Sequence, residues 1–188
     1  NSMERELASL SFPQAVFRVA VTEPEGLGMD GIHSTGRDMV EFLFSANPGE
    51  PAKPLVKIVS GGELSRLMLA MKCLLARRDQ VDTVIFDEVD AGIGGQAAEA
   101  VAGKISELAG HHQVVCITHL PQIAACADLH FKVEKRVEDG RTRTVINLLQ
   151  QEEQVAELAR MLGGDHPTAQ TLAFADELIE RRGKRKSA

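Results

Sequence analysis

The sequence has few cysteines, no long hydrophobic run and no excess of basic residues, and each absence excludes a class of protein. Its three cysteines, Cys73, Cys116 and Cys126, include no Cys-x-x-Cys pair, which argues against a zinc site or a disulfide framework and favours reduced thiols. No apolar run approaches the roughly 18 residues of a membrane span, and the first residues show no signal-peptide pattern. The formal net charge is -6, so a contact with DNA would need a local basic patch. We therefore expect a globular cytoplasmic protein without a membrane partner.

The 188 residues suffice for one domain with its own core. The chain opens with Asn1 rather than Met, and we expect it to be part of a longer protein. Residues 1–12 are predicted to be the end of a longer helix, which Pro13 terminates. Residues 13–182 are predicted to form the main lobe. The basic run at 183–188 is expected to be a disordered tail.

Hydrophobic periodicity predicts an α/β fold. The apolar residues that follow Ser60 recur at helical spacing and predict a helix with one buried face, made of Leu64, Leu67, Met68, Met71, Leu74 and Leu75. The runs at 82–87 and 113–118 lack polar alternation, which predicts strands buried on both faces of a mostly parallel sheet. The other segments predicted are antiparallel strands at 15–21 and 38–46 around a loop at 23–36, a hairpin over 129–149 that turns at 138–140, and helices at 95–108, 121–127, 152–162 and 168–182.

The helix start Ser60-Gly61-Gly62-Glu63 has two interpretations. Serine followed three residues later by glutamate is a capping box, which needs no ligand. Two consecutive glycines go beyond capping, because they let backbone N–H groups approach an anion at the positive end of the helix dipole. This stretch is therefore a candidate contact for the γ-phosphate of a nucleotide.

The pair Asp87-Glu88 ends the first apolar run. In open α/β sheets, ligands bind beyond the carboxyl ends of the strands. Asp87 could hold Mg²⁺ there, directly or through water, while Glu88 could orient and deprotonate an attacking water. The competing interpretation is that both are solvated loop carboxylates.

His119 ends the second apolar run. It should emerge at the same edge of the sheet as the acidic pair, where a neutral imidazole could hydrogen-bond a phosphate or the attacking water. A lone histidine is, however, more often structural. Asp90 could contact a partner subunit, or it could be an ordinary turn residue.

These motifs occur in the order seen in ABC-type ATPases, where they are called the signature motif, the Walker B motif, the D-loop and the switch histidine. Glu63 stands where transporters usually have Gln, which resembles the SMC-like branch that acts on DNA. More narrowly, the sequence is similar to the RecN family of bacterial DNA-repair proteins. The stretches that carry this resemblance are Val59 to Arg66, Ile85 to Ile93, Thr118 to Gln122 and Leu158 to Gly164.

One motif of that family is missing. The phosphate loop, or Walker A motif, has the form G-x-x-x-x-G-K-[ST], and neither Gly103-Lys104 nor Gly183-Lys184 fits it. In SMC-like proteins this loop lies in an N-terminal half beyond a long coiled coil. The resemblance therefore implies the C-terminal half of a P-loop ATPase head, with residues 1–12 as a stub of the coil. It also implies ATP and Mg²⁺ as ligands, a homodimer through the heads, DNA as a partner of the complete protein, and no complete ATPase in this chain alone.

Two alternatives remain open at this point. The chain could be the head half of another SMC-like protein, such as a cohesin-type or Rad50-type protein. It could also be a non-catalytic module of the same fold that binds a partner protein. The acidic pair and His119 favour an active site over a degenerate one.

Overall fold

A computed structural model describes residues 2–23, 36–58, 60–76, 78, 80–138 and 141–186. Most of the loop expected at 23–36 and the tip of the hairpin expected at 138–140 lie outside these residues. The described elements are α1 (Ser2–Ser9), β1 (Val16–Thr22), β2 (Met39–Ser45), β3 (Lys53–Pro54), a 3₁₀ turn (Leu55–Lys57), α2 (Gly61–Leu75), β4 (Thr83–Phe86), α3 (Gly95–Leu108), β5 (Gln113–Cys116), α4 (Pro121–Ala124), β6 (Phe131–Glu138), β7 (Arg141–Leu148), α5 (Gln151–Gly163) and α6 (Ala169–Lys186).

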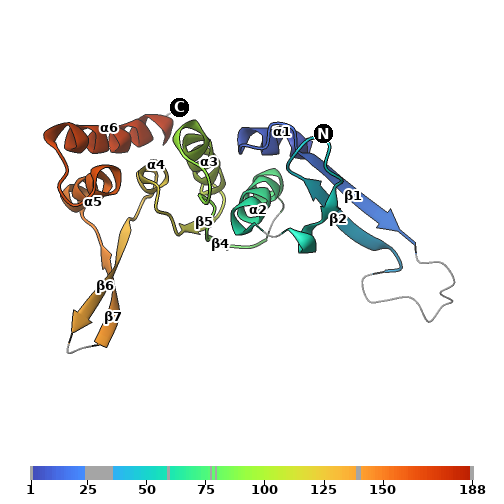
Figure 1. Ribbon diagram of the computed structural model, residues 1–188, viewed down its shortest axis with the longest axis horizontal. Helices are drawn as coiled ribbons and strands as arrows, with labels where there is room; N and C mark the ends of the chain where they lie inside the picture. The colour runs from blue at the N-terminus through green and yellow to red at the C-terminus, as the bar shows by residue number, and fades with distance from the viewer. Residues whose placement is uncertain are drawn as a thin grey trace.

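The helices form one layer along an elongated molecule, and the strands lie mainly below them (Figure 1). At one end β1, β2 and β3 form an antiparallel sheet, and at the other end β6 and β7 form a hairpin. Between them β4 and β5 pair in parallel, with Thr83 opposite Gln113 and Phe86 opposite Cys116. The predicted α/β class is therefore confirmed, and parallel pairing within the described residues is confined to β4 and β5.

Local sequence signals set the ends of several helices. Ser60 caps α2, Pro121 occupies the first turn of α4, and Gln150 forms a capping box with Glu153 at the start of α5. Helix α5 ends at Gly163, and its C-cap residue Gly164 has a φ of 81°, which glycine adopts without strain. These caps let the boundaries of most helices be predicted to within a few residues.

Buried hydrophobic side chains among the described residues form two clusters. The larger one joins α1, α2, α3 and the inner face of β4, and its fully buried side chains include Leu7, Leu67, Val101 and Leu108. The smaller one joins α4, α5 and α6 around Leu158 and Ala159. Within the described residues, strands β4 and β5 are thus covered from one side only, and their carboxyl ends emerge beside the start of α2.

Three expectations about burial and extent were wrong. Strand β4 alternates between exposed and buried residues because no described element covers its outer face. The buried side of α2 is formed by Gly62, Arg66, Leu67, Leu69 and Ala70, whereas Leu64, Met68, Leu74 and Leu75 are exposed. Helix α6 continues to Lys186, so most of the basic run expected to be a disordered tail is helical.

All three thiols are free. Among the described helices, none combines the length and the apolar character that crossing a membrane would require.

Candidate nucleotide site

The parallel register of β4 and β5 brings the predicted acidic pair and the predicted histidine to one edge of the molecule. The backbone N–H of Ile117 still donates to the carbonyl of Phe86 (2.9 Å), so the two chains leave the sheet side by side. Asp87 and Glu88 follow β4 with exposed side chains, and His119 follows β5 with a side chain that is 71% exposed. These carboxylates and this imidazole are therefore accessible to a ligand.

The N-terminus of α2 lies against the same edge. The Ser60 hydroxyl accepts a hydrogen bond from the N–H of Glu63 (3.4 Å), so capping by Ser60 is confirmed. A Cβ placed on Gly61 would come within 2.3 Å of the Glu88 Oε2, and one placed on Gly62 would come within 2.8 Å of the Ala91 Cβ. Gly62 is thus needed for close packing against the loop after β4, whereas at Gly61 only the flexible end of the Glu88 side chain would have to shift.

Two side chains of α2 fix the loop that follows β4, and sequence reasoning gave neither of them a role. The Ser65 hydroxyl donates to the carbonyl of Asp87 (2.7 Å), and the Arg66 guanidinium donates to the carbonyl of Ala91 (2.8 Å). The spacing of Arg66 could have indicated its burial. It lies four residues from both Gly62 and Ala70, on the helix face that is buried. Helix α2 and this loop therefore form one unit.

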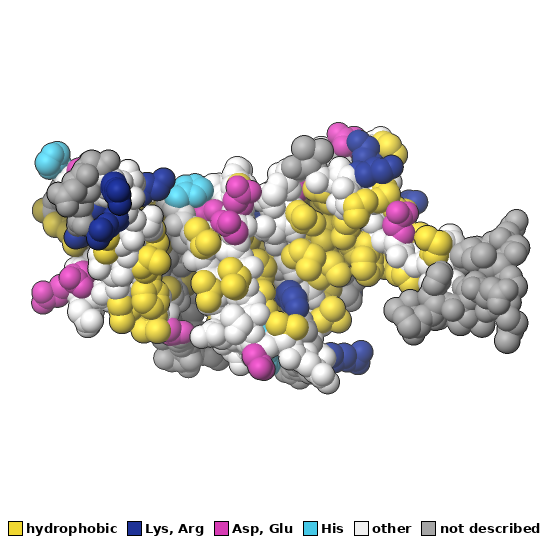
Figure 2. Space-filling model, turned by 90° about the horizontal axis from the view of Figure 1, so that it is seen from below, with side chains coloured by type: hydrophobic (Ala, Val, Ile, Leu, Met, Phe, Trp, Pro, Cys, Tyr) yellow, Lys and Arg dark blue, Asp and Glu magenta, His cyan; other side chains and the backbone are white. Residues whose placement is uncertain are grey.

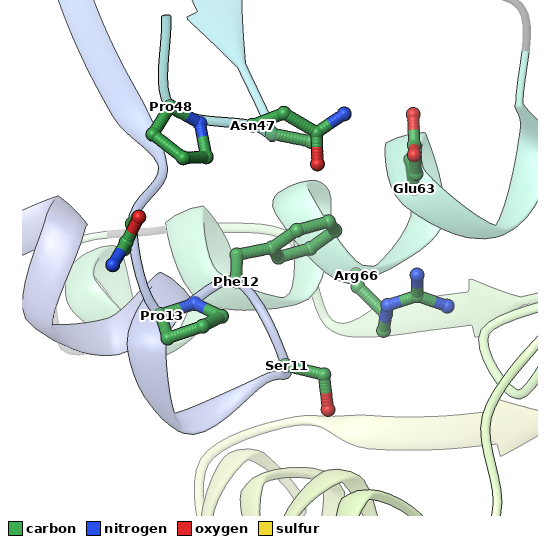
Figure 3. Close-up of a pocket in the computed structure, with 9 residues that line it drawn as sticks. Ser11, Phe12, Pro13, Asn47, Pro48, Glu63 and Arg66 are labelled. Atoms are coloured by element: carbon green, nitrogen blue, oxygen red, sulfur yellow. The ribbon is translucent and has the colours of Figure 1, made fainter.

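Arg66 also connects this unit to the end of α1. Its guanidinium lies 5.0 Å from the centre of the Phe12 ring, in cation–π geometry. Burial lowers the pKa of the Arg66 guanidinium, although nearby Glu63 acts in the opposite direction. These three residues line a pocket of about 250 Å³, in which Phe12 lies between Arg66 and the segment carrying Asn47 and Pro48 (Figure 3). The start of α2 is thus braced from the side of α1.

Asp90 is the most constrained residue of the site. Its side chain is buried, and one oxygen, Oδ2, accepts from the Thr118 hydroxyl (2.5 Å) and from the His119 backbone N–H (2.9 Å). The same oxygen lies 3.0 Å from the His119 Nδ1. The Asp90 carboxylate is therefore engaged within its own chain, and contact of this turn with a partner subunit stays a prediction.

The donor set fits a metal ion only in part. No group of three or more described His, Cys, Asp or Glu residues is arranged to hold a metal. Asp87 offers an exposed carboxylate, and Mg²⁺ commonly takes one or two protein carboxylates, with water and phosphate as its other ligands. The chain can thus supply one side of a magnesium site. The roles of Asp87, Glu88 and His119 stay predictions.

The curated proteins that are similar to this chain include several that carry the same name, RecN. No family model matches the chain. "DNA repair protein RecN" of Treponema pallidum is 55% identical over 154 residues, which are 79% of this chain and 27% of that protein. RecN of Bacillus subtilis is 42% identical over 100% of this chain and 34% of its own length. RecN of Deinococcus radiodurans is 46% identical over 95% of this chain and 30% of its own length. The chain thus spans about a third of the length of these relatives.

Solved structures show the same fold. The Smc head domain of Pyrococcus yayanosii, solved with a coiled coil and joint, matches with a TM-score of 0.59 and 26% identity over 84% of this chain and 28% of that chain. The Smc head domain of Pyrococcus furiosus, bound to the C-terminal domain of ScpA, matches with a TM-score of 0.54 and 23% identity. The match covers 85% of this chain and 37% of that chain. The chain is therefore similar over most of its length to a segment of RecN proteins, and it has the fold of an Smc head domain.

Proposed function

We propose that this chain is the C-terminal half of an ATPase head from a RecN-like protein, which acts in bacterial DNA double-strand-break repair and recombination. The observation that carries the proposal is the meeting of four motifs at one edge: the start of α2, the acidic pair after β4, Asp90, and His119 after β5. Similarity to proteins named for DNA repair supports the same assignment. We expect the complete protein in the bacterial cytoplasm, associated with the nucleoid.

In this proposal the chain contributes two faces of an ATP hydrolysis site. The start of α2, from Ser60 to Glu63, would bind the γ-phosphate held by a partner head, using backbone N–H groups and the helix dipole. Glu88 would orient and deprotonate the attacking water, and His119 would hydrogen-bond that water or the phosphate. Mg²⁺, held by Asp87 directly or through water, would neutralise charge on the phosphates.

The uncovered faces of the molecule support a second half of the head as a partner. Ile85, Val115 and Ile117 point away from the helix layer and are 67%, 45% and 58% exposed. The apolar face of the β6–β7 hairpin is also exposed, including Phe131 and Ile146. Hydrophobic side chains gather on this side of the molecule (Figure 2). Such an area is unusual for a complete soluble domain.

We assign the N-terminal half of the same protein to these faces. About two thirds of the length of the relatives lies outside this chain, and a parallel strand from that half could pair with the free edge of β5. That half would carry the Walker A loop and the main ATP site. Two complete heads would then enclose ATP between the signature stretch of one and the phosphate loop of the other, and hydrolysis would control DNA binding by the complete protein.

The proposal is tested by assembling the head from two chains. The chain alone should show no ATPase activity above background and no measurable ATP affinity at micromolar concentrations, because the β-phosphate has no phosphate loop. Adding the N-terminal half in trans should produce both. Calorimetry with Mg-ATP measures the binding, and tight stoichiometric binding by the isolated chain would overturn the split-head arrangement.

Glu88→Gln provides the catalytic control in the assembled head. ATP binding should persist while turnover falls roughly 10²–10⁴-fold, the scale for loss of a general base. Glu99→Gln, at an exposed position of α3, is the matched substitution that should leave turnover unchanged. Near-normal hydrolysis by Glu88→Gln would rule out Glu88 as the general base.

A further inference from the structure

We infer that Asp90 is a positioning residue that fixes the tautomer and the orientation of His119. The inference rests on the proposed function, in which His119 acts on the phosphate or its water. It goes beyond that function because the buried Asp90 carboxylate then positions a side chain of its own chain. The geometry around one oxygen atom carries it.

The Asp90 Oδ2 can only accept hydrogen bonds when the carboxylate is ionised. Its three neighbours are the Thr118 hydroxyl, the His119 backbone N–H and the His119 Nδ1. The first two donate, and at 3.0 Å the Nδ1 makes a favourable contact only if it carries a proton. In the neutral imidazole, a proton on Nδ1 leaves Nε2 with a free lone pair.

The orientation of the ring follows from the same contacts. Because Nδ1 is held by a carboxylate that is only 2% exposed, the ring cannot rotate without breaking that bond. The side chain is nevertheless 71% exposed. The nitrogen available at the surface is therefore Nε2, which can accept a hydrogen bond from water when neutral and donate one to a phosphate oxygen when protonated.

Other contacts hold Asp90 itself in place. The Arg66 guanidinium fixes the next residue through the Ala91 carbonyl, and the Thr118 hydroxyl accepts from the N–H of Leu120 (3.0 Å) while it donates to Asp90. The carboxylate is thus anchored from α2 on one side and from the loop after β5 on the other. A turn residue with a merely solvated side chain would need none of these contacts.

The first test is a long-range ¹H–¹⁵N correlation spectrum of the ¹⁵N-labelled chain, recorded where the imidazole is neutral. A His119→Gln sample identifies the signals of His119 among the six histidines. We expect the Nδ1–H tautomer in the unsubstituted chain and a shift toward Nε2–H in Asp90→Ala. Thr118→Val removes a different donor to Asp90 while keeping side-chain volume, and should retain Nδ1–H.

Two results of this measurement would overturn the inference. One is an Nε2–H tautomer in the unsubstituted chain. The other is an equal shift in Asp90→Ala and Thr118→Val, which would assign the effect to a loosened loop rather than to the carboxylate. Glu99→Ala, which removes an exposed carboxylate on α3, should leave the spectrum of His119 unchanged.

The second test uses the complete protein with its N-terminal half. Asp90→Ala should lower kcat roughly 10²-fold with little change in KM for ATP, as expected when a reacting group is misplaced. An unchanged kcat would overturn the positioning role. If the unsubstituted protein hydrolyses no ATP, the proposed function fails, but the tautomer measurement still decides whether Asp90 fixes His119.

Discussion

Replacing Gly62 with alanine is expected to destabilise the chain, whereas the same change at Gly61 is not. A Cβ at position 62 would lie 2.8 Å from the Ala91 Cβ and 3.0 Å from the Ala91 carbonyl oxygen. Neither atom can move alone, because the Arg66 guanidinium holds that carbonyl and Asp90 is anchored beside it. Helix α2 must therefore separate from the loop after β4, or the loop must shift.

The size of the effect follows from two opposing contributions. Forcing one extra carbon into a packed contact costs about 1–3 kcal/mol. Replacing glycine by alanine at a compatible helical position raises the free energy of unfolding by about 0.4–1 kcal/mol, mainly by restricting the unfolded chain. The net loss at position 62 should be about 1–2 kcal/mol. At position 61 the Cβ would meet only the Glu88 Oε2, at the end of a flexible exposed side chain, so the variant should match the unsubstituted chain or slightly exceed it in stability.

Urea unfolding followed by circular dichroism measures both variants on the same scale. For a denaturant slope of about 2 kcal/mol per molar, in the middle of the range for small proteins, the midpoint of Gly62→Ala should fall by about 0.5–1 M, with the slope unchanged. The midpoint of Gly61→Ala should stay or rise. Equal midpoints for the two variants would refute the close packing of α2 on the loop, and with it the argument that Gly62 is needed for more than contact with an anion.

Three further predictions concern other parts of the molecule. Burial alone would raise the pKa of Glu157, but hydrogen bonds from Arg160 and Lys132 outweigh it and lower that pKa below its ordinary value of 4.5. The contribution of Glu157 to stability is thus complete above pH 4.5 and is lost as the pH falls through the lowered pKa. Glu157→Gln should therefore weaken the dependence of Tm on pH in that acid range. Identical plots of Tm against pH for the two chains would contradict this. Burial raises the pKa of the Cys116 thiol to about 12. Mass spectrometry should therefore find this thiol far less alkylated by iodoacetamide in the native chain than in urea. Rapid alkylation of Cys116 in the native chain would count against its burial. In the assembled head, Ser60→Arg should abolish ATP-driven dimerisation in light scattering while ATP binding persists, and an unchanged dimer population would leave Ser60 as a helix cap alone.

Much of the fold could be predicted from the sequence because its signals are local. The alternation around Phe17, the cap at Ser60 and the glycine after α5 each depend on neighbours within a few residues, and the observed elements agree with them. The edge of the sheet was also predictable, since two parallel strands direct Asp87 and His119 to the same side. The chemical roles of these side chains were inferred from residue type, position and resemblance, and they stay predictions.

The remaining features depend on contacts between distant segments. Asp90 and Thr118 are separated by 28 positions, and Ser65 and Asp87 by 22, so no local pattern indicates that they bond. Burial was misjudged for a different reason. An apolar run shows that a strand or helix face will be covered, but it does not show whether the cover belongs to the same chain. Ile85 and Leu64 are exposed in the part of the chain that the structure describes.

The exposed apolar faces and the one-sided site have a common explanation. Ser65, Arg66 and Asp90 join α2 to the loops after β4 and β5 using donors and acceptors that all lie in this chain. The part of the site formed here is therefore organised before any partner binds. Among the described residues, no element covers the apolar side chains on the opposite face of β4 and β5, so their burial would contribute to association with the second half proposed above. In the proposed head, assembly would therefore leave Asp90 and His119 in place and add the missing phosphate loop opposite them.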